Sequence, residues 1–270
     1  MRRAPALVLA LSALAAALPA RAAAAPVRVA HVLVALCDND HQGIVPVSAA
    51  MGNGDDPERN LYWGARYGVR TFFTRAPGWR RLSVSAPGGP VLERAVFQHA
   101  ATGLYLVADG YRGAEIAAAV RDLLRAAAGR ERGTVRVESA GGAVELPLFS
   151  GADLLAYVGH DGLMDGWNPA VAALSAALPE RLPDAPRRPV LVIACASKTY
   201  FQGPLRRAGA EPLLWTTGLL AAEAYTLEAA LVAWAGGGDG AVVRERAAAA
   251  YATYQRCSAS AARRLFVTGW

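Results

Sequence analysis

Cysteine is scarce in this sequence, which has only Cys37, Cys195 and Cys257 among its 270 residues. A disulfide-rich scaffold is therefore excluded, because such scaffolds need several cysteine pairs in place of a large core. Internal repeats and low-complexity linkers are also missing, so we expect residues 25–270 to form a single domain. Beyond the first 24 residues, no stretch is long and apolar enough to cross a bilayer.

A stripe of basic residues, the usual mark of a nucleic-acid-binding surface, is absent as well. The formal net charge is +6, but Arg2, Arg3 and Arg21 belong to the N-terminal segment. Without these three, 25 basic residues face 22 acidic ones, and the arginines are scattered along the chain. The composition gives no reason to expect a nucleic-acid partner.

Residues 1–24 have the pattern of a secretory signal peptide. A basic start precedes the apolar run Ala6–Leu18, and cleavage after Ala22 or Ala24 would follow small residues. The alternative is an uncleaved membrane anchor, but this run is shorter than the roughly 20 residues that a helix needs to span a bilayer. We therefore expect an exported protein, periplasmic or extracellular, that has no membrane association after cleavage.

Apolar segments of strand length alternate with segments of helical periodicity along the rest of the chain. The predicted buried strands are Val27–Leu36, Gly103–Ala108, Leu154–Val158, Pro189–Ala194 and the shorter Glu211–Thr217. The predicted helices are Asn60–Phe73, Glu115–Ala128, Ala170–Leu178, Glu223–Ala235 and Val242–Gln255, with strand pairs in Trp79–Gln98 and Gly133–Phe149. Such alternation is typical of α/β proteins, and strands that are apolar throughout indicate a mostly parallel sheet covered on both faces. We therefore predict a three-layer α/β/α fold.

Chemically capable polar residues follow four of these strands. They lie in Cys37–His41, Asp109–Arg112, Gly159–Gly162 and Cys195–Ser197. Ligands bind outside the carboxyl ends of the strands in open α/β sheets, so we expect a site at this edge. His160 alone could be a loop residue, and Cys195 alone could be a small core residue. Together they suggest catalysis, because a cysteine nucleophile needs a base within hydrogen-bond reach.

The blocks LLAYVGHDG and VLVIACAS, whose histidine and cysteine lie 35 residues apart, resemble the signature of caspase-like (clan CD) cysteine peptidases such as legumains, gingipains and CHAT domains. The resemblance implies a caspase-like α/β/α fold with His160 and Cys195 as the catalytic pair. It also implies an oxyanion hole of backbone amides, from Cys195 and from Gly162 or from Asp161, which stands directly after the histidine. The substrate would be a peptide or protein, and no cofactor or metal is expected.

Three further residues are candidates for substrate binding. Asp109 and Arg112 follow the second buried strand, where Asp109 would favour a basic substrate side chain and Arg112 an acidic one. Both could instead be solvated loop residues. Trp215 follows the cysteine strand and could either line the cleft or belong to the core, where tryptophan usually lies.

Two other interpretations fit the sequence. The chain could be a catalytically inactive caspase-like protein that acts by binding or as a scaffold. It could also be a metal-dependent hydrolase using the loop Cys37–His41, although the spacing there matches no zinc signature. If Cys195 is a nucleophile it must stay reduced, so any disulfide would join Cys37 and Cys257.

Overall fold

The computed structural model describes residues 27–270, and the predicted signal peptide lies outside them. The strands of the main sheet are β1 (Val29–Ala35), β2 (Trp79–Ser85), β3 (Val91–His99), β4 (Tyr105–Tyr111), β7 (Leu154–Val158), β8 (Pro189–Ile193), β9 (Glu211–Thr216) and β10 (Phe266–Val267). Their order across the sheet is β10-β9-β8-β7-β1-β4-β3-β2. The neighbours from β9 to β4 are parallel, whereas β10, β3 and β2 extend the two edges antiparallel.

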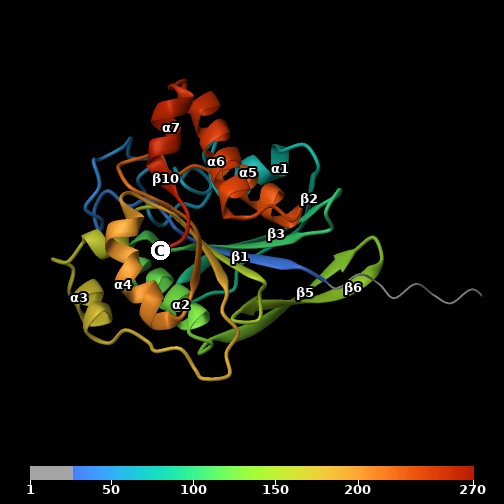
Figure 1. Cartoon of the computed structure of the whole chain (residues 1–270), viewed down its shortest axis with the longest axis horizontal. Coiled ribbons are helices and arrows are strands. Elements are labelled where there is room, and N and C mark those ends of the chain that lie inside the picture. Colours follow the sequence, from blue (N-terminus) through green and yellow to red (C-terminus); the bar gives the residue numbers. More distant parts are fainter. Residues whose placement is uncertain (1–26) are drawn as a thin grey trace, which may run out of the picture.

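Helices cover both faces of this sheet (Figure 1). They are α1 (Val69–Arg75), α2 (Ile116–Ala127), α3 (Pro169–Ala176), α4 (Ser197–Ala208), α5 (Ala224–Ala235), α6 (Gly240–Gln255) and α7 (Ala259–Leu265), with short 3-10 turns η1 (Gly113–Glu115) and η2 (Gly162–Met164). Helices α2, α3 and α4 pack on one face, and α1, α5, α6 and α7 pack on the other. The predicted three-layer α/β/α arrangement with a mostly parallel sheet is confirmed.

Strand β1 shows why its sequence is almost entirely apolar. Val29 and Leu33 pack into the core beneath α2, whereas Val32 and Val34 pack into the core beneath α5 and α6. Successive side chains of a strand point to opposite faces, so a central strand needs apolar residues at nearly every position. The exception, His31, is buried, and its Nε2 lies 2.9 Å from Oδ2 of Asp109. No helix in residues 27–270 has the length and apolar character required to span a bilayer.

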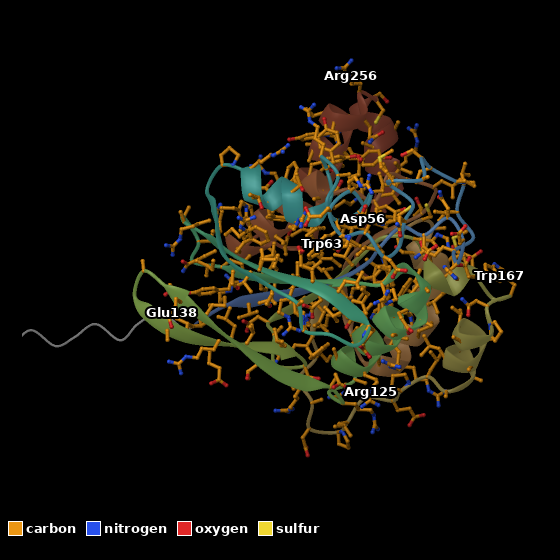
Figure 2. The ribbon with its side chains drawn as sticks, turned by 180° about the vertical axis from the view of Figure 1, so that it is seen from behind. Asp56, Trp63, Arg125, Glu138, Trp167 and Arg256 are labelled. Atoms are coloured by element: carbon orange, nitrogen blue, oxygen red, sulfur yellow. The ribbon has the colours of Figure 1, made fainter. Side chains whose placement is uncertain are left out.

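A separate hairpin, β5 (Arg132–Ser139) and β6 (Gly142–Phe149), projects from the layer that contains α2. The alternating residues around Gly141-Gly142 predict this hairpin, and the structure confirms it. Figure 2 shows Glu138 of β5 and Trp167, which follows η2, at opposite ends of the molecule. The hairpin is therefore far from the edge where the parallel strands end.

The predicted helix Asn60–Phe73 is mostly wrong, since only Val69–Arg75 is helical. Asn60 is buried, and its side chain accepts a hydrogen bond from the Cys37 amide at 3.0 Å and donates one to the Cys37 carbonyl at 2.8 Å. The chain also turns tightly at Gly64, where an added Cβ would lie 2.1 Å from the Glu58 carbonyl oxygen. These contacts with the end of β1 override the helical periodicity of the segment.

Candidate active site

Strands β7 and β8 lie side by side, so the residues that follow them share one edge of the sheet. Val158 is in register with Ile193, and the amide of Gly159 continues the pairing by donating to the Ile193 carbonyl at 3.2 Å. His160 and Cys195 each come two residues after that register pair. Neighbouring strands are about 4.8 Å apart, so the two residues follow adjacent strand ends at the carboxyl edge of the sheet.

Gly159 makes the turn that directs the chain away from β7. Its φ is 141°, and a Cβ added there would lie 2.8 Å from the Ala35 carbonyl oxygen at the end of β1. Only glycine fits a positive φ at such a close approach of two backbones. The glycine before His160 is therefore required by the packing of β7 against β1.

His160 is held by a carboxylate. Its Nε2 lies 3.0 Å from Oδ2 of Asp165, and both residues are buried. The two oxygens of Asp165 also accept from the amide of Gly43, at 3.1 and 3.2 Å, which ties the loop after β1 to this pair. The His160 carbonyl accepts from the Tyr157 hydroxyl at 2.7 Å. A carboxylate can only accept, so the imidazole proton lies on Nε2 and Nδ1 carries a lone pair.

Cys195 begins a sharp turn from β8 into α4. Ala196 has the left-handed conformation, φ 46° and ψ 31°, which is strained for any residue that has a Cβ. Its amide donates to the Gly218 carbonyl at 2.9 Å. Ser197 and Thr216 then lock the turn through reciprocal bonds, in which the Ser197 amide donates to Thr216 Oγ1 at 3.1 Å and the Thr216 amide donates to Ser197 Oγ at 3.0 Å. Strain that is held so firmly is typical of functional sites.

The sulfur of Cys195 is partly exposed and donates to the Leu220 carbonyl at 3.7 Å. Within residues 27–270, no hydrogen bond joins this sulfur directly to His160. Catalytic hydrogen bonds are often long or poorly aligned without substrate and tighten when it binds. The N-terminal end of α4 directly follows the cysteine, and a helix N-terminus favours negative charge nearby.

The predicted oxyanion donors are backbone amides. In the described part of the chain, the amides of Asp161 and Cys195 donate to no backbone or side-chain acceptor; Cys195 is partly exposed, whereas Asp161 is fully buried. Gly162 opens η2, and a Cβ added there would lie 2.8 Å from Ile116 of α2.

The Asp161 carboxyl group is fully buried. Its Oδ1 accepts from the Leu163 amide at 3.0 Å, and its Oδ2 has no hydrogen-bond partner. Burial raises the pKa of Asp161 to about 7, and the neighbouring Asp165 adds to this rise. Below about pH 7 the Asp161 carboxyl group is therefore mostly neutral.

Two residues of the site lack an obvious sequence signal. Asp165 follows His160 by only five residues, and this spacing is the one local hint of their pairing. Tyr62 has no such hint, because it comes from the turns before α1. Burial chiefly raises the pKa of Tyr62 far above its usual value, so its hydroxyl group stays neutral.

The loop Cys37–His41 folds on itself. Asp38 accepts from the amides of Asp40 and His41, at 2.9 and 3.1 Å, and its Oδ2 lies 2.9 Å from Nδ1 of His41. Cys37 is fully buried, and burial followed by the charge of Asp38 raises its pKa to about 12. In residues 27–270, no group of three or more histidine, cysteine or acidic side chains is arranged to hold a metal ion.

The structure corrects the prediction that Asp109 and Trp215 bind substrate. Asp109 lies inside β4 rather than after it, is fully buried, and is paired with Arg94 and His31. Trp215 is 1% exposed and donates from Nε1 to the Gly269 carbonyl at 3.1 Å, so it belongs to the core. Neither side chain is available to a ligand, since both are already enclosed by the protein.

Arg112 is different, because it directly follows β4 and remains partly exposed. Its guanidinium group pairs with Asp55, which belongs to the loop that lies over the end of β1. Its role in substrate binding stays a prediction.

All three cysteines are free thiols: Cys37 is buried, Cys195 is partly exposed and Cys257 is exposed. A disulfide between Cys37 and Cys257, the pairing expected if any disulfide formed, is not present. Cys37 is buried directly after the end of β1.

None of the protein-family models, curated proteins or solved structures compared with this chain matches it.

Proposed function

We propose that the protein is a cysteine peptidase or a related amide hydrolase, in which Cys195 is the nucleophile and His160 transfers protons. The observation that carries the proposal is the placement of both residues. Cys195 stands on a strained, firmly held turn after β8, and a carboxylate-bound His160 follows the adjacent strand β7. The resemblance of both sequence blocks to caspase-like peptidases supports the same pair.

The reaction would begin when His160 Nδ1 takes the proton of the Cys195 thiol. The thiolate attacks the carbonyl carbon of the substrate amide, and the resulting oxyanion is held by the amide of Cys195. The imidazolium, stabilised by Asp165, then protonates the leaving amine as the C–N bond breaks. Water, deprotonated by His160, hydrolyses the remaining thioester and restores the thiol.

A polypeptide substrate is supported by the exposed apolar side chains around this edge. Val45 is 88%, Leu219 is 75% and Trp167 is 64% exposed, and they belong to the loops after β1, β9 and β7 respectively. Figure 2 shows Trp167 at the outer margin of the molecule. Apolar side chains of a peptide that flank the scissile bond would cover these residues. The predicted signal peptide would place the activity in the periplasm or outside the cell.

The test is cleavage of a mixed-sequence peptide library, followed by mass spectrometry, for the protein and four variants. Cys195→Ala and His160→Gln should abolish cleavage. Asp165→Asn should slow it at least about tenfold, because the imidazole loses its carboxylate. Asp153→Asn is the matched control, since Asp153 also accepts from a backbone amide, that of Val29, but at the opposite edge of the sheet. Cleavage that survives in Cys195→Ala would contradict the proposal.

One observation favours a second candidate, an inactive binding protein with the same fold. The thiol of Cys195 is bonded to the Leu220 carbonyl and not to His160. If no peptide is cleaved and library peptides still bind, this candidate replaces the first.

A further inference from the structure

A groove of the molecule is lined by residues outside the candidate active site. It has a volume of about 580 Å³ and lies between α1, the turns before it and the end of α6. Its lining residues are Gly64, Arg66, Tyr67, Thr71, Phe72, Arg75, Ala76, Pro77 and Tyr254. None of these belongs to the candidate site. The volume is in the range of roughly 300–1,000 Å³ that small-molecule sites occupy.

The walls of this groove are aromatic, and contacts with neighbouring rings fix their positions. Tyr254 stacks on Tyr225 with ring centroids 4.3 Å apart and an interplanar angle of 3°. Tyr67 and Phe72 meet Tyr254 edge to face, at 5.5 and 6.0 Å. Tyr254 is 42% exposed, so one side of its ring is fixed while the rest faces the groove. A flat ligand would meet rings that need little reorganisation.

The charge of the groove is positive, and Arg66 already lies over the ring of Tyr67, with its Cζ 5.3 Å from the ring centroid. Arg66 and Arg75 are exposed, and neither forms an ion pair within residues 27–270. The nearby Arg70 differs, because it is paired with both Glu58 and Glu93. No acidic residue lines the groove. Aromatic rings by themselves attract cations, but two unpaired guanidinium groups repel them and attract anions.

We propose that this groove binds a small planar anion, in which an aromatic ring carries a carboxylate, sulfonate or phosphate group. The ring packs against Tyr254, Tyr67 and Phe72, and the anionic group pairs with the guanidinium groups of Arg66 and Arg75. Arginine suits this role, because its planar donors match the oxygens of such groups and it stacks on aromatic faces. The site is independent of the proposed peptidase activity.

The experiment compares two probes of similar shape and opposite charge, 2-naphthoate and 2-naphthylmethylammonium, by calorimetric titration. The protein used is the full chain after export, with Cys195→Ala, which excludes binding through the candidate nucleophile. We expect 2-naphthoate to bind with a stoichiometry of one and at least about tenfold more tightly than the cation. The double variant Arg66→Gln/Arg75→Gln should lose at least about tenfold in affinity for naphthoate.

The matched control is Arg80→Gln/Arg136→Gln, which removes the same charge from exposed residues of β2 and β5 outside the groove. It should bind naphthoate like the parent protein. Tyr254→Ala should weaken binding, and Tyr254→Phe, which keeps the ring, should restore it. Equal binding of both probes, no binding of naphthoate, or equal loss in the two double variants would overturn the proposal.

Discussion

Asp161 is the residue whose ionisation most directly affects both stability and the candidate site. Its carboxyl group is buried with one oxygen unpartnered, and its pKa is raised from 3.8 to about 7 by burial. Between pH 4 and pH 7 the native protein keeps a proton that the unfolded chain releases. Stability therefore falls as pH rises through this window and stays at its lower level above it.

Asp161→Asn removes this titration and keeps an acceptor for the Leu163 amide. Relative to the parent protein, the variant should gain about 2 to 3 kcal/mol of unfolding free energy between pH 5 and pH 8. Urea denaturation at both pH values measures the difference. Asp239→Asn, at the exposed cap of α6, is the control for removing a carboxylate from a helix cap. A difference between variant and parent that is the same at both pH values would show that Asp161 does not titrate in this way.

At the scale of elements, the turn between β8 and α4 concentrates strain next to the candidate nucleophile. Ala196→Gly should relieve the left-handed strain, which costs roughly 1–2 kcal/mol, and increase the free energy of unfolding by about 1 kcal/mol after the larger entropy of the unfolded chain is subtracted. Thermal or urea unfolding measures this. Ala194→Gly, two residues earlier and outside the left-handed region, should instead lose stability. If both variants lose stability, the turn is not strained.

Elements that depend on apolar runs were predictable from sequence, and elements that depend on distant contacts were not. The pattern predicts a strand at Leu154–Val158 and a helix at Glu115–Ala128, and the structure has β7 and α2 at these places. Helix α4 is not predictable in the same way, because Gly203 and Pro204 interrupt its pattern.

The residues of the candidate site differ in the same way in how far the sequence predicts them. The strand ends place His160 and Cys195 at one edge from sequence alone. The burial of Asp109 and Trp215 follows from partners that lie far away along the chain, such as Arg94 and Gly269.

At the scale of the whole molecule, the three cysteines lie in three different environments. Cys37 is in the core with a pKa raised to about 12, which keeps it a neutral thiol. Cys257 is exposed after α6, and Cys195 is only partly exposed at the carboxyl edge of the sheet. Exposure alone would make Cys257 react fastest. Activation by His160 would instead make Cys195 react fastest, so the order of reactivity separates a nucleophile from an ordinary thiol.

The most direct measurement is therefore the alkylation rate of each cysteine in the native protein with iodoacetamide, followed by mass spectrometry of the peptides. We expect Cys195 to be modified before Cys257 and Cys37 to stay unmodified. His160→Gln should slow the modification of Cys195 at least about tenfold without changing that of Cys257. The opposite order, with Cys257 modified first and Cys195 indifferent to His160→Gln, would contradict the assignment of the His160–Cys195 pair.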